Sequence, residues 1–169
     1  VSHTRKLIAL TSQPDAEFST RVATQIAPFK AEMNERVGRA QTALIRPQTL
    51  GGETPKARDE ESPADDLFAD AVRETANADA AFLPGVGYGI AIQPGDISAG
   101  QLKNLIPHDS DIVTMSLSGA QIKSILEQSI ENFTSEDAAQ KVGGMIQVSG
   151  VKFSYDPQRP HGSRVQSVA

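Results

Sequence analysis

Large apolar side chains near the start of the chain recur at intervals of three or four residues, a spacing that places them on one face of a helix. They are Phe18, Val22, Ile26, Phe29 and Met33. Asp15 is a suitable N-cap. Pro28 lacks a backbone N–H and should kink or split the helix. Gly38 is expected to end it, and residues 37–44 can form a short strand.

Three further helices are predicted. Ser62-Pro63 joins a capping serine to a proline at the first helical position, which predicts a helix to about Thr75. A brief helix carries Leu102 and Leu105 and ends at Pro107. The fourth begins with a capping-box pattern at Ser118 and runs to about Asn132. Its buried stripe is expected to be Ile122, Ile125, Leu126 and Ile130.

Short apolar runs between glycine and proline turns predict strands. The runs are 80–83, 90–92, 112–117, 145–148, 151–155 and 164–168, and the last three are expected to form an antiparallel meander. Helices and strands mix without a regular βαβ period, which indicates an α+β fold with a mixed or antiparallel sheet and packed helices. We expect a linker helix and first strand over 1–45, a flexible loop over 46–61 and one domain over 62–169.

Composition narrows the function classes. Of 169 residues 38% are hydrophobic and the net charge is −5, so no general attraction to nucleic acid polymers or anionic lipid is expected. No apolar run approaches the ~20 residues of a transmembrane helix, so no transmembrane segment is predicted. The absence of cysteine excludes a disulfide or a thiolate metal site in this chain. Any signal peptide is expected to lie upstream of Val1.

Several short motifs follow one another in a specific order. Glu61-Ser62 opens a helix, and a glycine-rich turn spans 84–89. They are followed by Pro94-Gly95-Asp96-Ile97-Ser98, Leu117-Ser118-Gly119-Ala120-Gln121, Gly143-Gly144-Met145-Ile146-Gln147-Val148-Ser149-Gly150 and Tyr155-Asp156-Pro157. In this order, from about Asp15 to Val168, they resemble the C-terminal domain of the 5'-nucleotidase family, which includes UDP-sugar hydrolases and, more distantly, thiosulfohydrolases.

This resemblance implies that two domains of the protein have different functions. In the family, an N-terminal metallophosphoesterase domain supplies two divalent metal ions and the catalytic histidine, while the C-terminal domain grips the base and sugar of a nucleotide. The family's metal signatures are missing here, and the three histidines stand at positions 3, 108 and 161. We therefore expect no catalytic residue, metal ligand or cofactor in this chain, and a metallophosphoesterase domain of the same protein as its partner. By resemblance, the protein is expected to be periplasmic or extracellular.

The resemblance also points to substrate-binding residues. In Pro107-His108-Asp109-Ser110, His108 takes the place of the family's base-stacking phenylalanine and Ser110 that of an asparagine. The second stacking aromatic is expected beyond Ala169, so the domain looks truncated. In the glycine turn, Pro84 and Gly89 replace the family's substrate-binding asparagine and arginine, which leaves Gly87, Tyr88 and Gly89 as candidates. Arg58 stands where relatives often place a basic ligand.

Each candidate also has a purely structural interpretation. The glycines can serve a tight turn, Tyr88 can pack in the core, and His108 can be a solvated surface residue. Asp65 and Asp66 are most simply first-turn carboxylates that complement the helix dipole. Glu131, Glu136 and Asp137 are expected to form a solvated edge. Two alternative functions stay open: a degenerate, non-catalytic binding module, and a domain of a thiosulfohydrolase-like relative.

Overall fold

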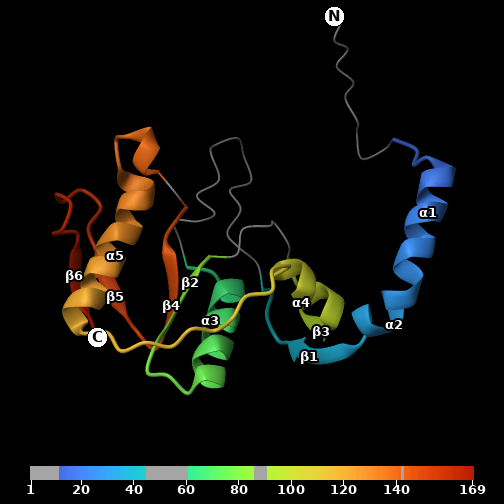
Figure 1. The fold of residues 1–169 in the computed structure, drawn as a ribbon, viewed down its shortest axis with the longest axis horizontal. Coiled ribbons are helices and arrows are strands. Elements are labelled where there is room, and N and C mark those ends of the chain that lie inside the picture. The colour runs from blue at the N-terminus through green and yellow to red at the C-terminus, as the bar shows by residue number, and fades with distance from the viewer. Residues whose placement is uncertain (1–11, 45–60, 86–90, 142) are drawn as a thin grey trace, which may run out of the picture.

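The structure is a computed structural model that describes residues 12–44, 61–85, 91–141 and 143–169 (Figure 1). Its helices are α1 (Ala16–Ile26), α2 (Lys30–Met33), α3 (Pro63–Ala76), α4 (Ala99–Leu105) and α5 (Gly119–Thr134), with 3-10 turns η1 (Ala27–Phe29) and η2 (Ala138–Gln140). Its strands are β1 (Arg36–Ala40), β2 (Ala81–Pro84), β3 (Gly95–Ser98), β4 (Ile146–Ser149), β5 (Phe153–Tyr155) and β6 (Val165–Val168).

The described strands pair two by two, each time antiparallel. β1 pairs with β3, β2 with β4, and β5 with β6. A single bridge between Leu44 and Ile92 extends the contact of β1 with the region before β3. Helices combined with small antiparallel sheets confirm the predicted α+β class.

Several strand predictions are wrong. Of the predicted run 90–92, residues 91 and 92 belong to no strand, Ile92 forms only an isolated bridge with Leu44, and residue 90 lies outside the described residues. Residues 112–117 form no strand, although their apolar and polar residues mostly alternate. Alternation describes side chains only, and a strand also requires a neighbouring backbone edge. Residues 145–168 do not form one meander, because β4 pairs with the earlier β2 and leaves β5 and β6 to pair with each other. Gly38 does not end a helix but lies in β1, beside a register irregularity.

A first apolar core joins β1, β3, α3 and α4. Its buried members are Ala40, Ala64, Ile92, Ile97 and Leu105, and Phe68 packs against them from α3. The Ser62 hydroxyl caps α3 by accepting from the backbone N–H of Asp65 at 3.2 Å, and it donates to the Asp65 carboxylate at 2.6 Å. The predicted start of this helix is therefore confirmed, and the cap fixes the face that enters the core.

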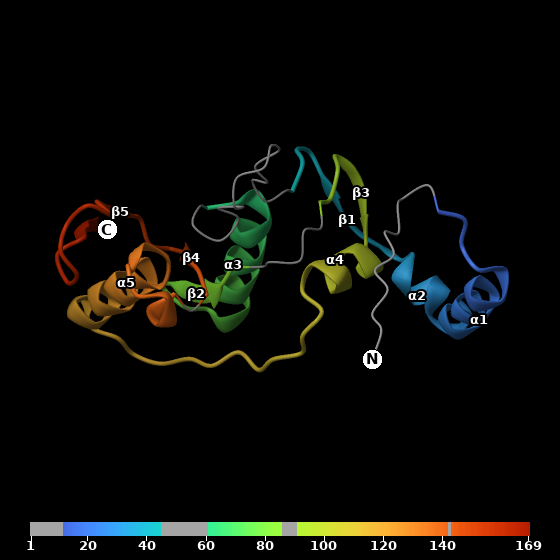
Figure 2. The same cartoon turned by 90° about the horizontal axis from the view of Figure 1, so that it is seen from above.

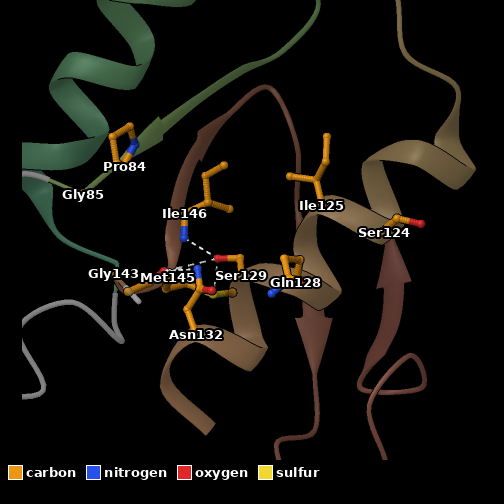
Figure 3. Close-up of a pocket in the computed structure, with 11 residues that line it drawn as sticks. Pro84, Gly85, Ser124, Ile125, Gln128, Ser129, Asn132, Gly143, Met145 and Ile146 are labelled. Atoms are coloured by element: carbon orange, nitrogen blue, oxygen red, sulfur yellow. Dashed lines mark hydrogen bonds between the residues drawn. The ribbon is translucent and has the colours of Figure 1, made fainter. Parts of the chain in front are cut away.

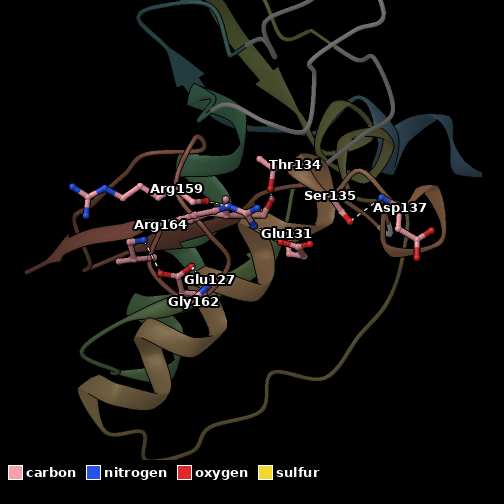
Figure 4. A network of polar contacts seen from close by, with 10 residues as sticks. Glu127, Glu131, Thr134, Ser135, Asp137, Arg159, Gly162 and Arg164 are labelled. Carbon is pink, nitrogen blue, oxygen red and sulfur yellow. Dashed lines mark hydrogen bonds and ion pairs between the residues drawn. The ribbon is translucent and has the colours of Figure 1, made fainter.

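A second apolar core lies under α5. Leu126 and Ile130 are fully buried and pack with Met145 and Val165. Beside it, a polar network ties α5 to the turn before β6 (Figure 4). The Glu127 carboxylate accepts from the backbone N–H groups of Gly162 and Val165 at 3.1 and 2.7 Å. One helix side chain thus satisfies two backbone donors, one in the turn before β6 and one at the first residue of β6.

The same network corrects one expectation about the surface. Glu131 is not part of a solvated edge, because it is half-buried and forms an ion pair with Arg164. The Arg164 guanidinium, by hydrogen bonding, holds the pKa of Glu131 below its usual range. Glu136 and Asp137 are exposed, as predicted. Periodicity along α5 could not reveal the cation, which comes from the loop after β5.

Helix α3 is also fastened to β4 through a serine. The Ser149 hydroxyl donates to Asp70 at 2.5 Å and accepts from the Arg73 guanidinium at 2.7 Å. The next residue, Gly150, has φ +76°, and an added Cβ would lie 2.1 Å from the carbonyl oxygen of Asp79. Only glycine fits such a close approach. Ser149-Gly150 therefore closes the turn between β4 and β5 against α3.

Helix α1 extends from the body as an arm (Figures 1 and 2). Pro28 lies in η1, which separates α1 from α2, so the predicted break is confirmed. The short α2 anchors the arm on α4: Glu32 and Lys103 pair at 2.6 Å, and a Cβ on Gly100 would meet the Met33 carbonyl oxygen at 2.9 Å. α1 itself has no buried residue.

Candidate functional site

A cavity of about 600 Å³ lies between α3, β2 and the segment that follows α4. We call it the site cavity. Its first wall consists of Phe68, Val72, Phe82, Leu83, Pro84 and Gly85. Its second wall consists of Ile106, His108, Ser110, Asp111, Ile112 and Val113.

The first wall belongs to two elements that are packed and hydrogen-bonded to the rest of the fold. Phe68 belongs to the capped helix α3 and packs against the first core. Phe82 lies in β2, opposite Val148 of β4 in the ladder. These two rings reach the cavity from different elements, both of which are fixed by backbone hydrogen bonds. The first wall therefore offers a preformed apolar and aromatic surface.

The second wall is built differently. α4 ends at Leu105 before Pro107, and the chain then runs in extended form to α5. Within the described part of the chain, residues 109–117 form no backbone–backbone hydrogen bond. Ile112 is 48% exposed and Val113 74% exposed. His108 and Ser110 are exposed as well, so this wall presents polar groups on a segment that can adjust to a ligand.

Among the described residues that line the cavity, the charged side chain lies on the second wall. Asp111 is the carboxylate among the described lining residues, and His108 and Ser110 add an imidazole and a hydroxyl that can hydrogen-bond. A carboxylate disfavours a phosphate close by and can accept from N–H or O–H donors. The site cavity is thus suited to an uncharged ligand part that has a flat apolar face and a few donors.

The first turn of α3 carries the strongest electrostatic perturbation in the described residues. Partial burial, together with the neighbouring carboxylates of Glu61, Asp65 and Asp70, raises the pKa of Asp66 to about 6. The described residues contain no group of three or more histidine, cysteine or acidic side chains able to hold a metal ion. Asp66 is therefore one of several neighbouring carboxylates, and the described residues around it do not form a metal-binding group.

A second cavity, of about 520 Å³, shares Pro84 and Gly85 with the site cavity but opens between α5 and the start of β4 (Figure 3). Ser124, Gln128 and Asn132 line it from α5. The Ser129 hydroxyl accepts from the backbone N–H of Ile146 at 2.6 Å. No aromatic ring and no ionisable side chain is among the described residues that line this cavity. We therefore regard the site cavity as the candidate site.

The structure brings together two of the predicted site residues, His108 and Ser110, on one wall. Gly87, Tyr88, Gly89 and Arg58 lie outside the described residues, so their roles stay predictions. The cavity also contains groups that sequence reasoning did not assign to a site. The sequence pattern places Phe68 on the apolar face of a helix and Phe82 in a buried strand. Their spacing does not indicate that they line a cavity.

Comparison with known proteins places the chain in a family. Residues 36–169 match the model of the 5'-nucleotidase, C-terminal domain, and the chain therefore belongs to this family. Among curated proteins, it is 29% identical to the trifunctional nucleotide phosphoesterase protein YfkN of Bacillus subtilis, over 85% of this chain and 10% of that protein.

Solved structures of related proteins agree with this family assignment. A 5'-nucleotidase precursor from Thermus thermophilus superposes with a TM-score of 0.67 at 26% identity, over 92% of this chain and 29% of that one. The sulfate thiohydrolase SoxB from the same organism gives a TM-score of 0.71 at 29% identity, over 92% and 28%. The chain thus spans less than a third of these structures and about a tenth of YfkN. No helix among the described residues is long and apolar enough to span a membrane.

Proposed function

We propose that this chain is the substrate-binding domain of a nucleotide hydrolase and that it holds the nucleoside part of the substrate in the site cavity. One observation carries the proposal. His108 and Ser110 meet two phenylalanine rings, Phe68 and Phe82, around a cavity of about 600 Å³ in a chain of the 5'-nucleotidase C-terminal family.

The proposed recognition is by stacking and hydrogen bonding. A base stacked on an aromatic face contributes about 1–3 kcal/mol, whichever base it is. In this proposal His108 supplies such a face from the second wall and Phe82 supplies one from the first wall; both residues line the cavity. Ser110 and Asp111 would then accept from N–H groups of the base or O–H groups of the sugar.

Hydrolysis is assigned to a different part of the protein. The proposed partner is a metallophosphoesterase domain of the same polypeptide, which would hold divalent metal ions that polarise the phosphate and activate water. Binding of the nucleoside by this chain would fix the orientation of the phosphate toward those ions. The word precursor in the name of the Thermus relative supports export to a periplasmic or extracellular location.

A second candidate is a role in a thiosulfohydrolase-like enzyme. The similarity to SoxB favours it, because the TM-score of 0.71 is combined with 29% identity. A sulfate thiohydrolase, by its name, acts on a sulfur compound, and that reaction requires no base to stack. The two candidates therefore differ in whether nucleosides bind the site cavity.

The test is steady-state hydrolysis of AMP by the intact natural protein. His108→Ala should raise KM about 5- to 150-fold with little change in kcat, because a stacking contact of about 1–3 kcal/mol is lost. His108→Phe should lower KM by restoring a larger ring. His161→Ala is the matched control, since His161 is exposed in the turn before β6, away from the site cavity.

An unchanged KM in both His108 variants would refute the assignment of this cavity. Binding of a nucleoside must also raise the unfolding temperature, because the ligand stabilises the native state by mass action. No shift with adenosine at millimolar concentration, in a protein that still hydrolyses a sulfur ester, would favour the thiosulfohydrolase-like candidate.

A further inference from the structure

The apolar stripe of α1 is exposed along its whole length. Phe18 is 65% exposed, Val22 39%, Ile26 44% and, in the adjoining turn, Phe29 58%. The spacing of these four side chains is that of a buried helix face, and α1 is capped by Asp15, whose carboxylate accepts from the Phe18 N–H at 2.7 Å. The helix is therefore amphipathic and pre-formed, with nothing among the described residues covering its apolar side.

Contiguous exposed apolar side chains on an ordered helix indicate an interaction surface. Among the described residues, the contacts that anchor the arm lie at its C-terminal end, where α2 packs on α4. The Lys103 ammonium pairs with Glu32, and the backbone N–H of Ala99 donates to the Glu35 carbonyl at 2.8 Å. The opposite side of α1 is polar, and the hydroxyls of Thr20 and Thr24 there donate to backbone carbonyls one turn earlier. The apolar face of α1 is thus suited to burial, and its polar face is suited to contact with water.

The comparisons bear on which part of the protein lies next to the stripe. The family match begins at residue 36, after α1. The structural matches, however, extend over 92% of the chain, which is more than residues 36–169 can supply. Part of the region before β1 is therefore shared with those structures, in which more than two thirds of the chain lies outside the matched part.

We propose that the stripe of Phe18, Val22, Ile26 and Phe29 is the docking surface for the catalytic domain of the same polypeptide. The inference rests on the proposed function, because it takes the chain to work with such a domain. The stripe precedes the substrate-binding domain directly. Its burial would hold the arm against the catalytic domain, while α2 and α4 hold it on this one.

Cysteine labelling tests this directly. The chain contains no cysteine, so Val22→Cys reports on the stripe and Thr24→Cys on the opposite face of the same helix. Trypsin places both in one peptide, residues 22–30, and peptide mapping separates it from any other cysteine of the intact protein. Labelling with a maleimide is followed in the intact natural protein and in the 169-residue chain.

In the intact protein we expect Val22→Cys to react at least about 10-fold more slowly than Thr24→Cys, whereas in the 169-residue chain the two rates should agree within about 3-fold. Equal rates in the intact protein would overturn the proposal. Protection that appears only at high concentration would identify a second copy as the occupant, and protection in the 169-residue chain at any concentration would identify a cover within that chain. Either result would overturn the proposal.

A second variant keeps the proposal separate from the proposed function. Val22→Glu should lower the unfolding midpoint of the intact protein but leave that of the 169-residue chain unchanged. Nucleoside binding in the site cavity is read out independently, through the KM effect of His108→Ala. A protected stripe without nucleoside binding would therefore refute the substrate assignment and leave the docking surface standing.

Discussion

Helices α1 and α5 have similar patterns of apolar and polar residues but differ in how far their apolar faces are buried. Both carry an apolar stripe at helical spacing and a side chain that caps the first turn. α5 buries Leu126 and Ile130 completely in the second core, whereas α1 buries none of its residues. Periodicity thus predicts that a face exists, and only the surrounding chain decides whether that face is covered.

The largest difference is expected from truncation of the two stripes. Leu126→Ala should reduce the free energy of unfolding by about 2–5 kcal/mol, because Leu126 is fully buried and a cavity would remain. Val22→Ala should change it by less than about 0.5 kcal/mol in the 169-residue chain, since Val22 is exposed. Urea denaturation followed by circular dichroism measures both. Similar losses would show that α1 is packed in this chain.

Substitution of the N-cap residues of α1 and α5 should show the same difference between the two helices. Ser118 and Gln121 form a capping box on α5, and Ser118→Ala should cost about 1 kcal/mol of global stability. Asp15→Ala removes the cap of α1, whose unfolding need not involve the cores. We expect it to lower helical ellipticity slightly without shifting the unfolding midpoint. A shifted midpoint would mean that α1 folds cooperatively with the rest.

The smallest effect is expected from two ion pairs. Lys103 lowers the pKa of Glu32 and Arg164 lowers that of Glu131, in each case mainly through a hydrogen bond. A carboxyl group with a lowered pKa stabilises the fold above its unfolded pKa, and this contribution is lost as pH falls through the folded value. Glu131→Gln should therefore flatten the acid limb of the stability profile between about pH 5 and 3.

Glu32→Gln is the control for that profile. Both partners of the Glu32–Lys103 pair are well exposed, whereas the Arg164 and Glu131 side chains are 11% and 19% exposed. An exposed pair contributes little because water and salt screen it. The expected order is a larger change for Glu131→Gln, read from thermal midpoints at several pH values. The reverse order would contradict the packing described for α5.

The elements that sequence reasoning predicted well have local signals. Ser62-Pro63 and the Ser118 capping box located α3 and α5 closely, and Pro28 located the break after α1. Residues 112–117 lack such a signal: the pattern predicts a strand, but the outcome depends on a partner edge that lies far away in sequence. The same holds for the pairing of β4 with β2.

The candidate site was predicted in part, for a related reason. Family resemblance pointed to His108 and Ser110 by their position after Pro107, and both line the site cavity. Phe68 and Phe82 carry no such mark, because a phenylalanine that lines a cavity and one that fills a core have the same periodicity. Their contribution depends on how α3 and β2 meet the segment after α4, which is a tertiary feature.

Binding of the nucleoside in the site cavity is the central feature of the proposed function. Photolabelling of the intact protein with 8-azidoadenosine, followed by tryptic mapping, tests it. We expect the label on residues 104–123 or 74–103, which carry the second wall and Phe82 of the first, and adenosine should compete for it. Competable label confined to residues 124–141 and 142–152, which line the second cavity, would contradict the account.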